Sequence, residues 1–359
     1  MTGSMLLQDA TLGRREALAA LAGLGLAGTV QAAPQRGRRG GLDWADPKDN
    51  LFAFGKIWAG YDGPVIGAYH RVMYGRLPDR RLVPLFNYEG TGVLEAKINP
   101  DGSYQVKSRE TGYFTDLLTR EVLETWRNPF TDETVEVYHF YNDVVGGRIG
   151  LTIPDFVMSD GSSTQMNAGL NVRAADGTYP FRVPIEFYGD TAMMSWDYAH
   201  RKTNPVDPAG WPRASTGAVI TPSEHFTFNV SRKLLEDRSV PQVPFTAGFT
   251  RLSEPWPFMK MGGTPFAGMT VFGRMFSHKG LKGFGEVPPK LLAYIEKNAP
   301  QYLALPDGWP VTNARLDTWT CYAMDVPPEN TDFAWKCAGK ERPGKNAPPP
   351  TGAGARSWR

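Results

Sequence analysis

The feature that most constrains the fold is a series of short runs in which apolar and polar residues alternate, separated by turn signals. The clearest case is the pair of runs at residues 92–98 and 103–107, which flank the sequence Asn-Pro-Asp-Gly at 99–102. Proline presets φ in such a turn and glycine takes the positive φ that closes it. This stretch therefore predicts a β-hairpin.

The next stretch of this kind is residues 125–143, TWRNPFTDETVEVYHFYND. Residues 120–126 and 134–141 have strand-like alternation, and Asn128 must be extended because it precedes a proline. Further strands are predicted at residues 148–153, 185–188, 192–196, 224–231, 246–252 and 269–275. Their spacing predicts a mostly β protein whose antiparallel strands form a barrel or a sandwich, with a calycin-like barrel favoured.

A few helices are predicted to plug or flank this sheet. Asp46 and Pro47 form a helix start before residues 48–58, and residues 288–303 place apolar side chains along one stripe. The sequence has no repeat of fixed period and no convincing domain linker. We therefore predict a single β-rich domain over residues 46–337.

The N-terminus has the features of an export signal. Arg14 and Arg15 precede an apolar run at residues 17–27, and residues 30–32 (VQA) offer small side chains at a cleavage point. The run is shorter than the roughly 20 apolar residues that a bilayer requires, so no stable membrane span is predicted. Residues 1–32 are predicted to be a twin-arginine signal peptide, which engages the twin-arginine export machinery and makes the mature protein periplasmic. The alternative is an ordinary buried helix.

Both ends of the mature chain are polar. Residues 33–45 are predicted to be a flexible linker and residues 338–359 a disordered basic tail, because neither composition can bury enough apolar surface to fold. The formal net charge is +2. The tails carry a positive excess and leave a mildly acidic body, which argues against nucleic acid as a partner. The two cysteines, Cys321 and Cys337, either pair in an oxidising compartment or remain separate thiols.

No motif of high chemical specificity is present. The sequence lacks a phosphate-binding glycine loop, a paired-cysteine metal site and the HExxH and GxSxG signatures, and its five histidines are scattered. We therefore predict no cofactor and no metal. Aromatic residues make up 12% of the chain, which favours an apolar or aromatic small molecule as the ligand.

His139 is the histidine with the strongest case for a catalytic role. Strict alternation would place Val135, Val137, His139 and Tyr141 on one face of a strand, and the apolar side chains indicate that this face points inward. An inward imidazole can act as an acid or a base near neutral pH. The alternatives are a histidine hydrogen-bonded within the core or one on the wet face.

Five other side chains are candidates for contact with such a ligand or for chemistry on it. Trp256 and Met261 belong to an irregular apolar stretch suited to a pocket wall, and Arg274 is suited to hold a substrate anion. Tyr198 follows a strand in a dense polar cluster. His225 shares its strand face with polar residues, so it faces either solvent, which is the favoured outcome, or a polar lumen.

Two segments together resemble a bacterial family grouped as domain of unknown function 1838, a family of exported proteins without an assigned activity. The resemblance extends over residues 46–335. It rests on Trp126, Asn128, Pro129, Thr131, Glu133, His139 and Asn142, and then on Trp256, Pro257, Met261, Gly262 and Lys279. Asp132 stands where the family usually has glycine. The resemblance implies that the hairpin from Trp126 to His139 is a family hallmark, and a hallmark can be structural.

Two functions are consistent with these observations. The first is a periplasmic, cofactor-independent enzyme of the lyase, isomerase or decarboxylase type, which acts on a hydrophobic or aromatic molecule in a barrel cavity. His139 would be its acid or base, Tyr198 or Tyr141 the hydroxyl partner, Arg274 the anion anchor and Asn142 a further contact. The alternative is a non-catalytic binding or carrier protein for the same class of ligand. The sequence leaves the oligomeric state open.

Overall fold

The computed structural model describes residues 41–77, 79, 81–152, 156–157, 163–167, 175, 178–199, 201–309, 317–336 and 338, without the side chains of residues 142–146, 156–157, 163–167, 198 and 199. The chain divides into two units, Met1–Arg39 and Gly40–Arg359, and all described residues belong to the second. The predicted signal peptide, most of the basic tail and Cys337 lie outside the described residues, so these predictions remain untested.

Most of the described chain is one antiparallel sheet of 11 strands. Its strands are β1 (Val65–Arg76), β2 (Leu82–Ile98), β3 (Tyr104–Thr115), β6 (Phe140–Ile149), β7 (Phe156–Val157), β8 (Ser163–Asn167), β9 (Ile185–Tyr188), β10 (Thr191–Ala199), β13 (Ser223–Ser231), β14 (Phe245–Ser253) and β15 (Thr270–Leu281). Two short hairpins, β4 (Thr125–Arg127) with β5 (Thr134–Glu136) and β11 (Lys202–Thr203) with β12 (Val219–Ile220), stand apart from it.

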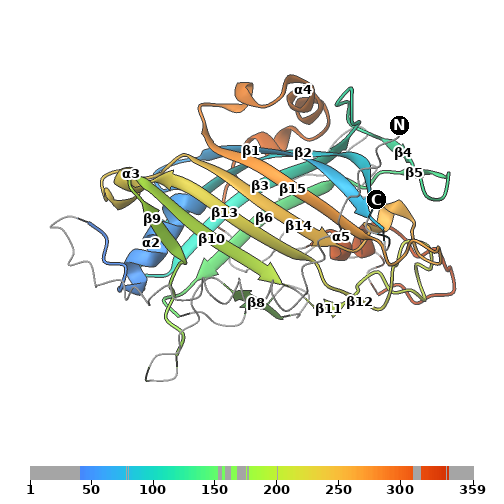
Figure 1. Ribbon diagram of the computed structural model, residues 1–359, viewed down its shortest axis with the longest axis horizontal. Coiled ribbons are helices and arrows are strands. Elements are labelled where there is room, and N and C mark those ends of the chain that lie inside the picture. The colour runs from blue at the N-terminus through green and yellow to red at the C-terminus, as the bar shows by residue number, and fades with distance from the viewer. Residues whose placement is uncertain are drawn as a thin grey trace, which may run out of the picture. The chain divides into compact units, whose positions relative to one another are not determined.

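The strand order is β6-β3-β2-β1-β15-β14-β13-β10-β8-β7, with β9 paired to β10 (Figure 1). The first and last long strands, β1 and β15, are therefore neighbours in the middle of the sheet. The predicted mostly β, antiparallel fold is confirmed. The hydrogen-bonded order ends at β6 and β7, so the described strands do not close into the calycin-like barrel that the sequence favoured.

The hairpin predicted at residues 99–102 joins β2 to β3. Gly102 has φ 82°, and its N–H donates to the carbonyl oxygen of Asn99 at 2.8 Å. The long β2–β3 ladder that follows pairs Asn87 with Thr115 at its far end. The local turn chemistry thus fixes the register of two of the longest strands.

The two faces of the sheet differ in what covers them. α4 (Pro289–Asn298) packs on the outer face, where it buries Tyr113 of β3 and Tyr141 of β6 (Figure 1). The opposite face, called the inner face below, carries the side chains of Tyr69, Arg71 and Met73 on β1.

α2 (Pro47–Trp58) packs against the inner-face side chains of the sheet. Asp46 caps its first turn by accepting from the N–H of Lys48 at 2.9 Å, as the sequence predicts. Phe54 of α2 stacks on Trp196 of β10 at 4.5 Å between ring centroids. α2 therefore covers this part of the inner face.

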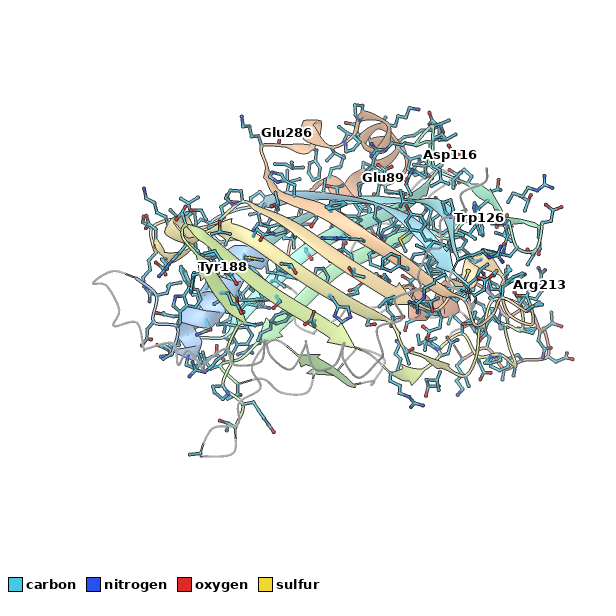
Figure 2. The ribbon with its side chains drawn as sticks, viewed as in Figure 1. Glu89, Asp116, Trp126, Tyr188, Arg213 and Glu286 are labelled. Atoms are coloured by element: carbon cyan, nitrogen blue, oxygen red, sulfur yellow. The ribbon has the colours of Figure 1, made fainter. Side chains whose placement is uncertain are left out.

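A second core cluster lies around α5 (Thr318–Asp325) and the β4–β5 hairpin. Trp126 and Arg213 mark this end of the sheet, and Tyr188 marks the opposite end (Figure 2). The remaining helical segments are α3 (Arg232–Glu236), η1 (Pro257–Met259), η2 (Phe284–Glu286) and η3 (Pro300–Leu303). Among the helices described, none has the length and apolar character needed to cross a membrane.

Candidate functional site

A cavity of about 140 Å³ lies on the inner face of the sheet, beside α2. Its walls are mostly aromatic or apolar. They include Trp58, Tyr69, Phe226, Phe228, Phe249 and Met275, with polar groups from Ser108, Glu110, Ser277 and Lys279. An apolar cavity of about 150 Å³ holds a benzene molecule, so this space is the size of a single aromatic ring.

Glycines on β2 and β3 make room for the tyrosines near this cavity. A Cβ atom on Gly90 would lie 2.2 Å from the ring of Tyr69. A Cβ atom on Gly112 would lie 2.1 Å from Oη of Tyr88 and 2.9 Å from Oη of Tyr69. Both phenol groups therefore converge above Gly112, in a space that a side chain at this position would fill.

The two tyrosine hydroxyls are weak acids that keep their protons. Burial, followed by the charges of neighbouring groups that include Glu110, raises the pKa of Tyr69 well above its ordinary value of 10. The same two effects raise the pKa of Tyr88. Tyr69 donates its hydroxyl proton to the carbonyl oxygen of Thr111 at 2.9 Å. At neutral pH these phenols are thus hydrogen-bond donors or acceptors and not phenolates.

Arg71 is the most unusual residue of the inner face. It is 1% exposed, and none of its three guanidinium nitrogens has a hydrogen-bond partner among the described residues. Its Cζ lies 4.8 Å from the ring centroid of Tyr88 and 5.0 Å from that of Phe249. Burial and the charge of Arg251 lower the pKa of Arg71 from 12.5 to about 10. The cation is therefore placed where its charge is disfavoured and its donors are unused.

Two largely buried carboxylates among the described residues have partners. Glu89, which is also 1% exposed, accepts from the hydroxyl of Thr115 at 2.8 Å and from Nε of Arg120 at 2.8 Å. Glu224, near Arg71, forms an ion pair with Arg251 at 2.8 Å. The unpaired state of Arg71 is therefore not a general property of this interior.

Sequence reasoning missed Arg71. The signal was present in AYHRVMYGR, because alternation places Tyr69, Arg71 and Met73 on one face between two apolar neighbours. The pairing of β1 with both β2 and β15, which buries this face, lies far away in sequence.

The prediction that His139 points into a barrel interior is wrong. His139 is 3% exposed and packs against Tyr113, at 5.2 Å between centroids, and against Tyr294 of α4, on the face opposite to the cavity. β5 ends at Glu136 and β6 begins at Phe140, so the alternation that starts at residue 135 does not continue through residue 139.

The chemistry of His139 follows from this burial. Its Nδ1 accepts from the backbone N–H of Phe114 at 3.3 Å. Burial lowers the pKa of His139 to about 3, so the ring is neutral at physiological pH. Tyr141 lies in the same layer, with its ring 5.6 Å from that of Tyr113. The structure thus brings His139 and Tyr141 together, but beneath α4 and away from the cavity.

The remaining predicted residues fall outside the cavity or outside the described side chains. His225 is exposed on the outer face, with Nδ1 3.1 Å from Oδ1 of Asp197, so the solvent alternative is confirmed. Arg274 is also exposed on the outer face and stacks on Phe276. It is therefore not placed to anchor an anion in the cavity. Tyr198 of β10 and Asn142 of β6 have described backbones only.

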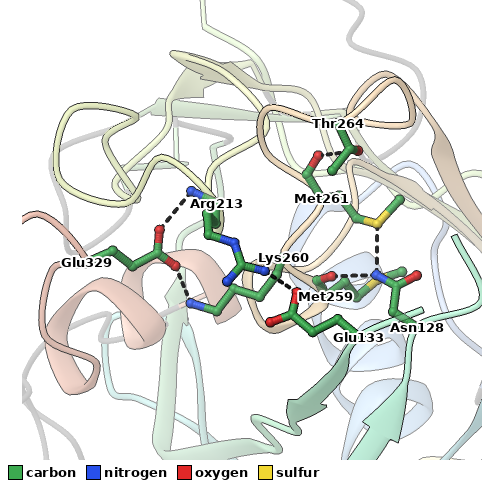
Figure 3. Close-up of polar contacts among 8 residues, drawn as sticks. All are labelled: Asn128, Glu133, Arg213, Met259, Lys260, Met261, Thr264 and Glu329. Carbon is green, nitrogen blue, oxygen red and sulfur yellow. Dashed lines mark hydrogen bonds and ion pairs between the residues drawn. The ribbon is translucent and has the colours of Figure 1, made fainter. Parts of the chain in front are cut away.

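Trp256 and Met261 are buried core residues and do not line this cavity. Trp256 is 2% exposed and contacts Phe114 at 5.0 Å between ring centroids. Met261 is fully buried, and its Sδ accepts from Nδ2 of Asn128 at 3.1 Å. The same amide donates to the carbonyl oxygen of Met259 at 2.8 Å (Figure 3). These contacts fasten the β4–β5 hairpin to the segment around η1.

Two ion pairs add to these contacts between the hairpin and its neighbours. Glu329 pairs with Nζ of Lys260 and accepts from the backbone N–H of Arg213 at 2.7 Å (Figure 3). The guanidinium of Arg213 pairs in turn with Glu133 of the hairpin turn. The family resemblance implied that the hairpin from Trp126 onward is a hallmark. Its contacts here are structural, because they attach the hairpin to the segments around Arg213 and η1.

A metal site would need a cluster of ligating side chains. Among the described residues, no group of three or more His, Cys, Asp or Glu side chains is arranged to hold a metal ion. Cys321 is buried on α5, and its predicted partner lies outside the described residues.

Comparison with known proteins gives a family but no activity. A solved structure described as "Crystal Structure of Rv2717c from M. tuberculosis" aligns with 61% of this chain and 91% of its own, at 8% identity and a TM-score of 0.21. No curated protein sequence matches the chain. The family model described as "Protein of unknown function (DUF1838)" matches residues 65–322, which include the inner face, the cavity and the hairpin. The chain therefore belongs to the DUF1838 family.

Proposed function

We propose that this protein binds a small apolar or aromatic molecule in the cavity beside α2. The observation that carries the proposal is a ring-sized space of about 140 Å³ with aromatic walls contributed by β1, β13, β14 and α2. Ligand sites in proteins are concave and mostly apolar, with a few placed polar groups. The walls here have that composition, with Ser277 and Glu110 among the polar groups.

Binding is better supported than catalysis. An acid–base enzyme needs a group that exchanges a proton near pH 7 and reaches the ligand. His139 lies beneath α4 with a pKa of about 3, and the phenols of Tyr69 and Tyr88 keep their protons far above neutral pH. The enzymatic alternative therefore rests on two other side chains that line the cavity, Glu110, which lies close to both phenols, and His278.

A titration of the mature protein with 4-fluorotoluene, followed by ¹⁹F NMR, tests the proposal. We expect saturable binding that is lost in Ser277→Leu, because the larger side chain fills the cavity. Ser277→Ala is the matched control, since it removes the hydroxyl without filling the space, and it should bind as the wild type does. Binding that survives Ser277→Leu in a folded variant would contradict this site.

The predicted periplasmic location is a separate proposal that rests on residues 1–32 alone. Replacing Arg14 and Arg15 together by lysine should block export through the twin-arginine route. Cell fractionation would then find the unprocessed precursor inside the cell, whereas correct processing of this variant would exclude that route.

A further inference from the structure

Arg71 differs in its hydrogen bonding from the two buried lysines of the same interior. Nζ of Lys279 donates to the carbonyl oxygens of Lys56, Ile57 and Ala59 at 2.7, 2.5 and 2.8 Å. This satisfies the C-terminal end of α2, whose last carbonyl groups have no partner within the helix.

Lys56 has an equivalent role. Its Nζ donates to the carbonyl oxygens of Leu234, Leu235 and Asp237 at 2.7, 3.0 and 2.7 Å, at the end of α3. Each lysine therefore holds the fold together with three hydrogen bonds. Arg71 makes none, although a guanidinium has five N–H donors.

The position of Arg71 connects it to the cavity. On β1, His70 pairs with Phe276 and Met73 with Gly273, so Arg71 is level with Met275 of β15. Met275 is in turn paired with Phe249 of β14. Met275 and Phe249 both line the cavity, and the ring of Phe249 also contacts the guanidinium of Arg71. The cation thus adjoins two residues of the cavity wall, Met275 and Phe249.

This part of the wall is adaptable, and the guanidinium has no hydrogen-bond partner among the described residues. Met275 is unbranched and can change rotamer to open a path, as methionines do in variable binding sites. The contacts with Tyr88 and Phe249 involve ring faces and occupy no N–H group. Glu224, a carboxylate whose charge acts on Arg71, is engaged by Arg251. A planar carboxylate can therefore meet Arg71 through two parallel hydrogen bonds.

We infer that the ligand is a single-ring aromatic carboxylate, whose ring fills the cavity and whose carboxylate pairs with Arg71. This inference rests on the proposed function, because it names the chemical class of the molecule bound in the same cavity. The ring size follows from the cavity volume, and the charge follows from the unpaired guanidinium. An uncharged ring would leave Arg71 as it is.

Paired ¹⁹F NMR titrations on the mature protein test the inference, with 4-fluorobenzoate and 4-fluorobenzyl alcohol as probes of similar size and different charge. We expect the wild type to bind the benzoate at least about tenfold more tightly, a difference of about 1.4 kcal/mol. Arg71→Met should lose this preference and still bind the alcohol. Arg71→Lys should keep part of it, because the charge remains but the planar fork is lost.

Arg274→Met is the matched control, since Arg274 lies on the outer face of β15, and it should keep the full preference. Equal binding of the two probes by the wild type, or a preference that survives in Arg71→Met, would overturn the inference and leave the proposed function standing. If neither probe binds and 4-fluorotoluene also does not bind, the proposed function fails as well. Each variant is first shown to be folded by its thermal unfolding transition.

Discussion

Replacing Arg71 by methionine should make the ligand-free protein more stable. The substitution keeps an unbranched apolar stem and removes the buried charge. Burial and neighbouring charges lower the pKa of Arg71 from 12.5 to about 10. A tenfold change in an ionisation equilibrium is about 1.4 kcal/mol, so the charged form costs about 3 kcal/mol in this environment.

Two favourable contacts are lost in the same substitution. The ring contacts with Tyr88 and Phe249 contribute about 1 kcal/mol each. The net expectation for Arg71→Met is a gain of about 1 kcal/mol in the free energy of unfolding. This agrees in sign with the gain of about 1–4 kcal/mol seen when buried ionic groups are replaced by apolar residues of similar volume.

Urea unfolding at pH 7 measures this change. Arg274→Met is the control, because an exposed arginine on the outer face should alter stability by no more than about 0.5 kcal/mol. A loss of more than about 2 kcal/mol in Arg71→Met, at an unchanged urea m-value, would refute the reasoning. It would mean that the guanidinium has structural partners in solution and is no anchor for a ligand.

Three further predictions concern stability. Since the folded-state pKa of His139 is about 3 and its unfolded value is 6.5, its contribution to stability is complete above pH 6.5 and is lost as the pH falls toward 3. His139→Phe should therefore remove about 2 kcal/mol of the difference in unfolding free energy between pH 7 and pH 5, and an unchanged pH profile would contradict the burial of a neutral ring. Gly112→Ala should lower the free energy of unfolding in urea by about 1–3 kcal/mol, because its Cβ would clash with Oη of Tyr88. Gly147→Ala is the control and should change it little, because the nearest atom to its Cβ lies at 3.4 Å. Lys279→Met should lower the free energy of unfolding by about 3 kcal/mol, since it leaves carbonyl oxygens at the end of α2 without a donor, and a neutral effect in thermal unfolding would exclude that capping role.

The parts of the fold that could be predicted from sequence are those set by local chemistry. The turn at residues 99–102 and the start of α2 at Asp46 each depend on residues within one or two turns of chain, and both were predicted correctly. The pairing of β1 with β15 joins segments about two hundred residues apart, and it places them in the middle of the sheet. No local pattern encodes that pairing.

The candidate site was harder to predict because it depends on which face of each strand is buried. Arg71 and Arg274 both lie on strands with clear alternation, yet one is enclosed and the other exposed. Their difference arises because Arg71 points to the inner face, where Tyr88 and Phe249 enclose it, whereas Arg274 points to the outer face. For His139 the error was local, since a three-residue break between β5 and β6 shifted the face.

The cost of burying Arg71 also couples binding to stability. A ligand that binds only the folded protein stabilises it, and a carboxylate on Arg71 would in addition supply the hydrogen bonds that the guanidinium lacks. An anionic ring should therefore raise the unfolding temperature more than a neutral ring at the same concentration. Lys56 and Lys279, by contrast, already have their hydrogen bonds at the ends of α3 and α2. The proposed carboxylate ligand would give this buried guanidinium, next to a cavity of ring size, the hydrogen bonds that it lacks among the described residues.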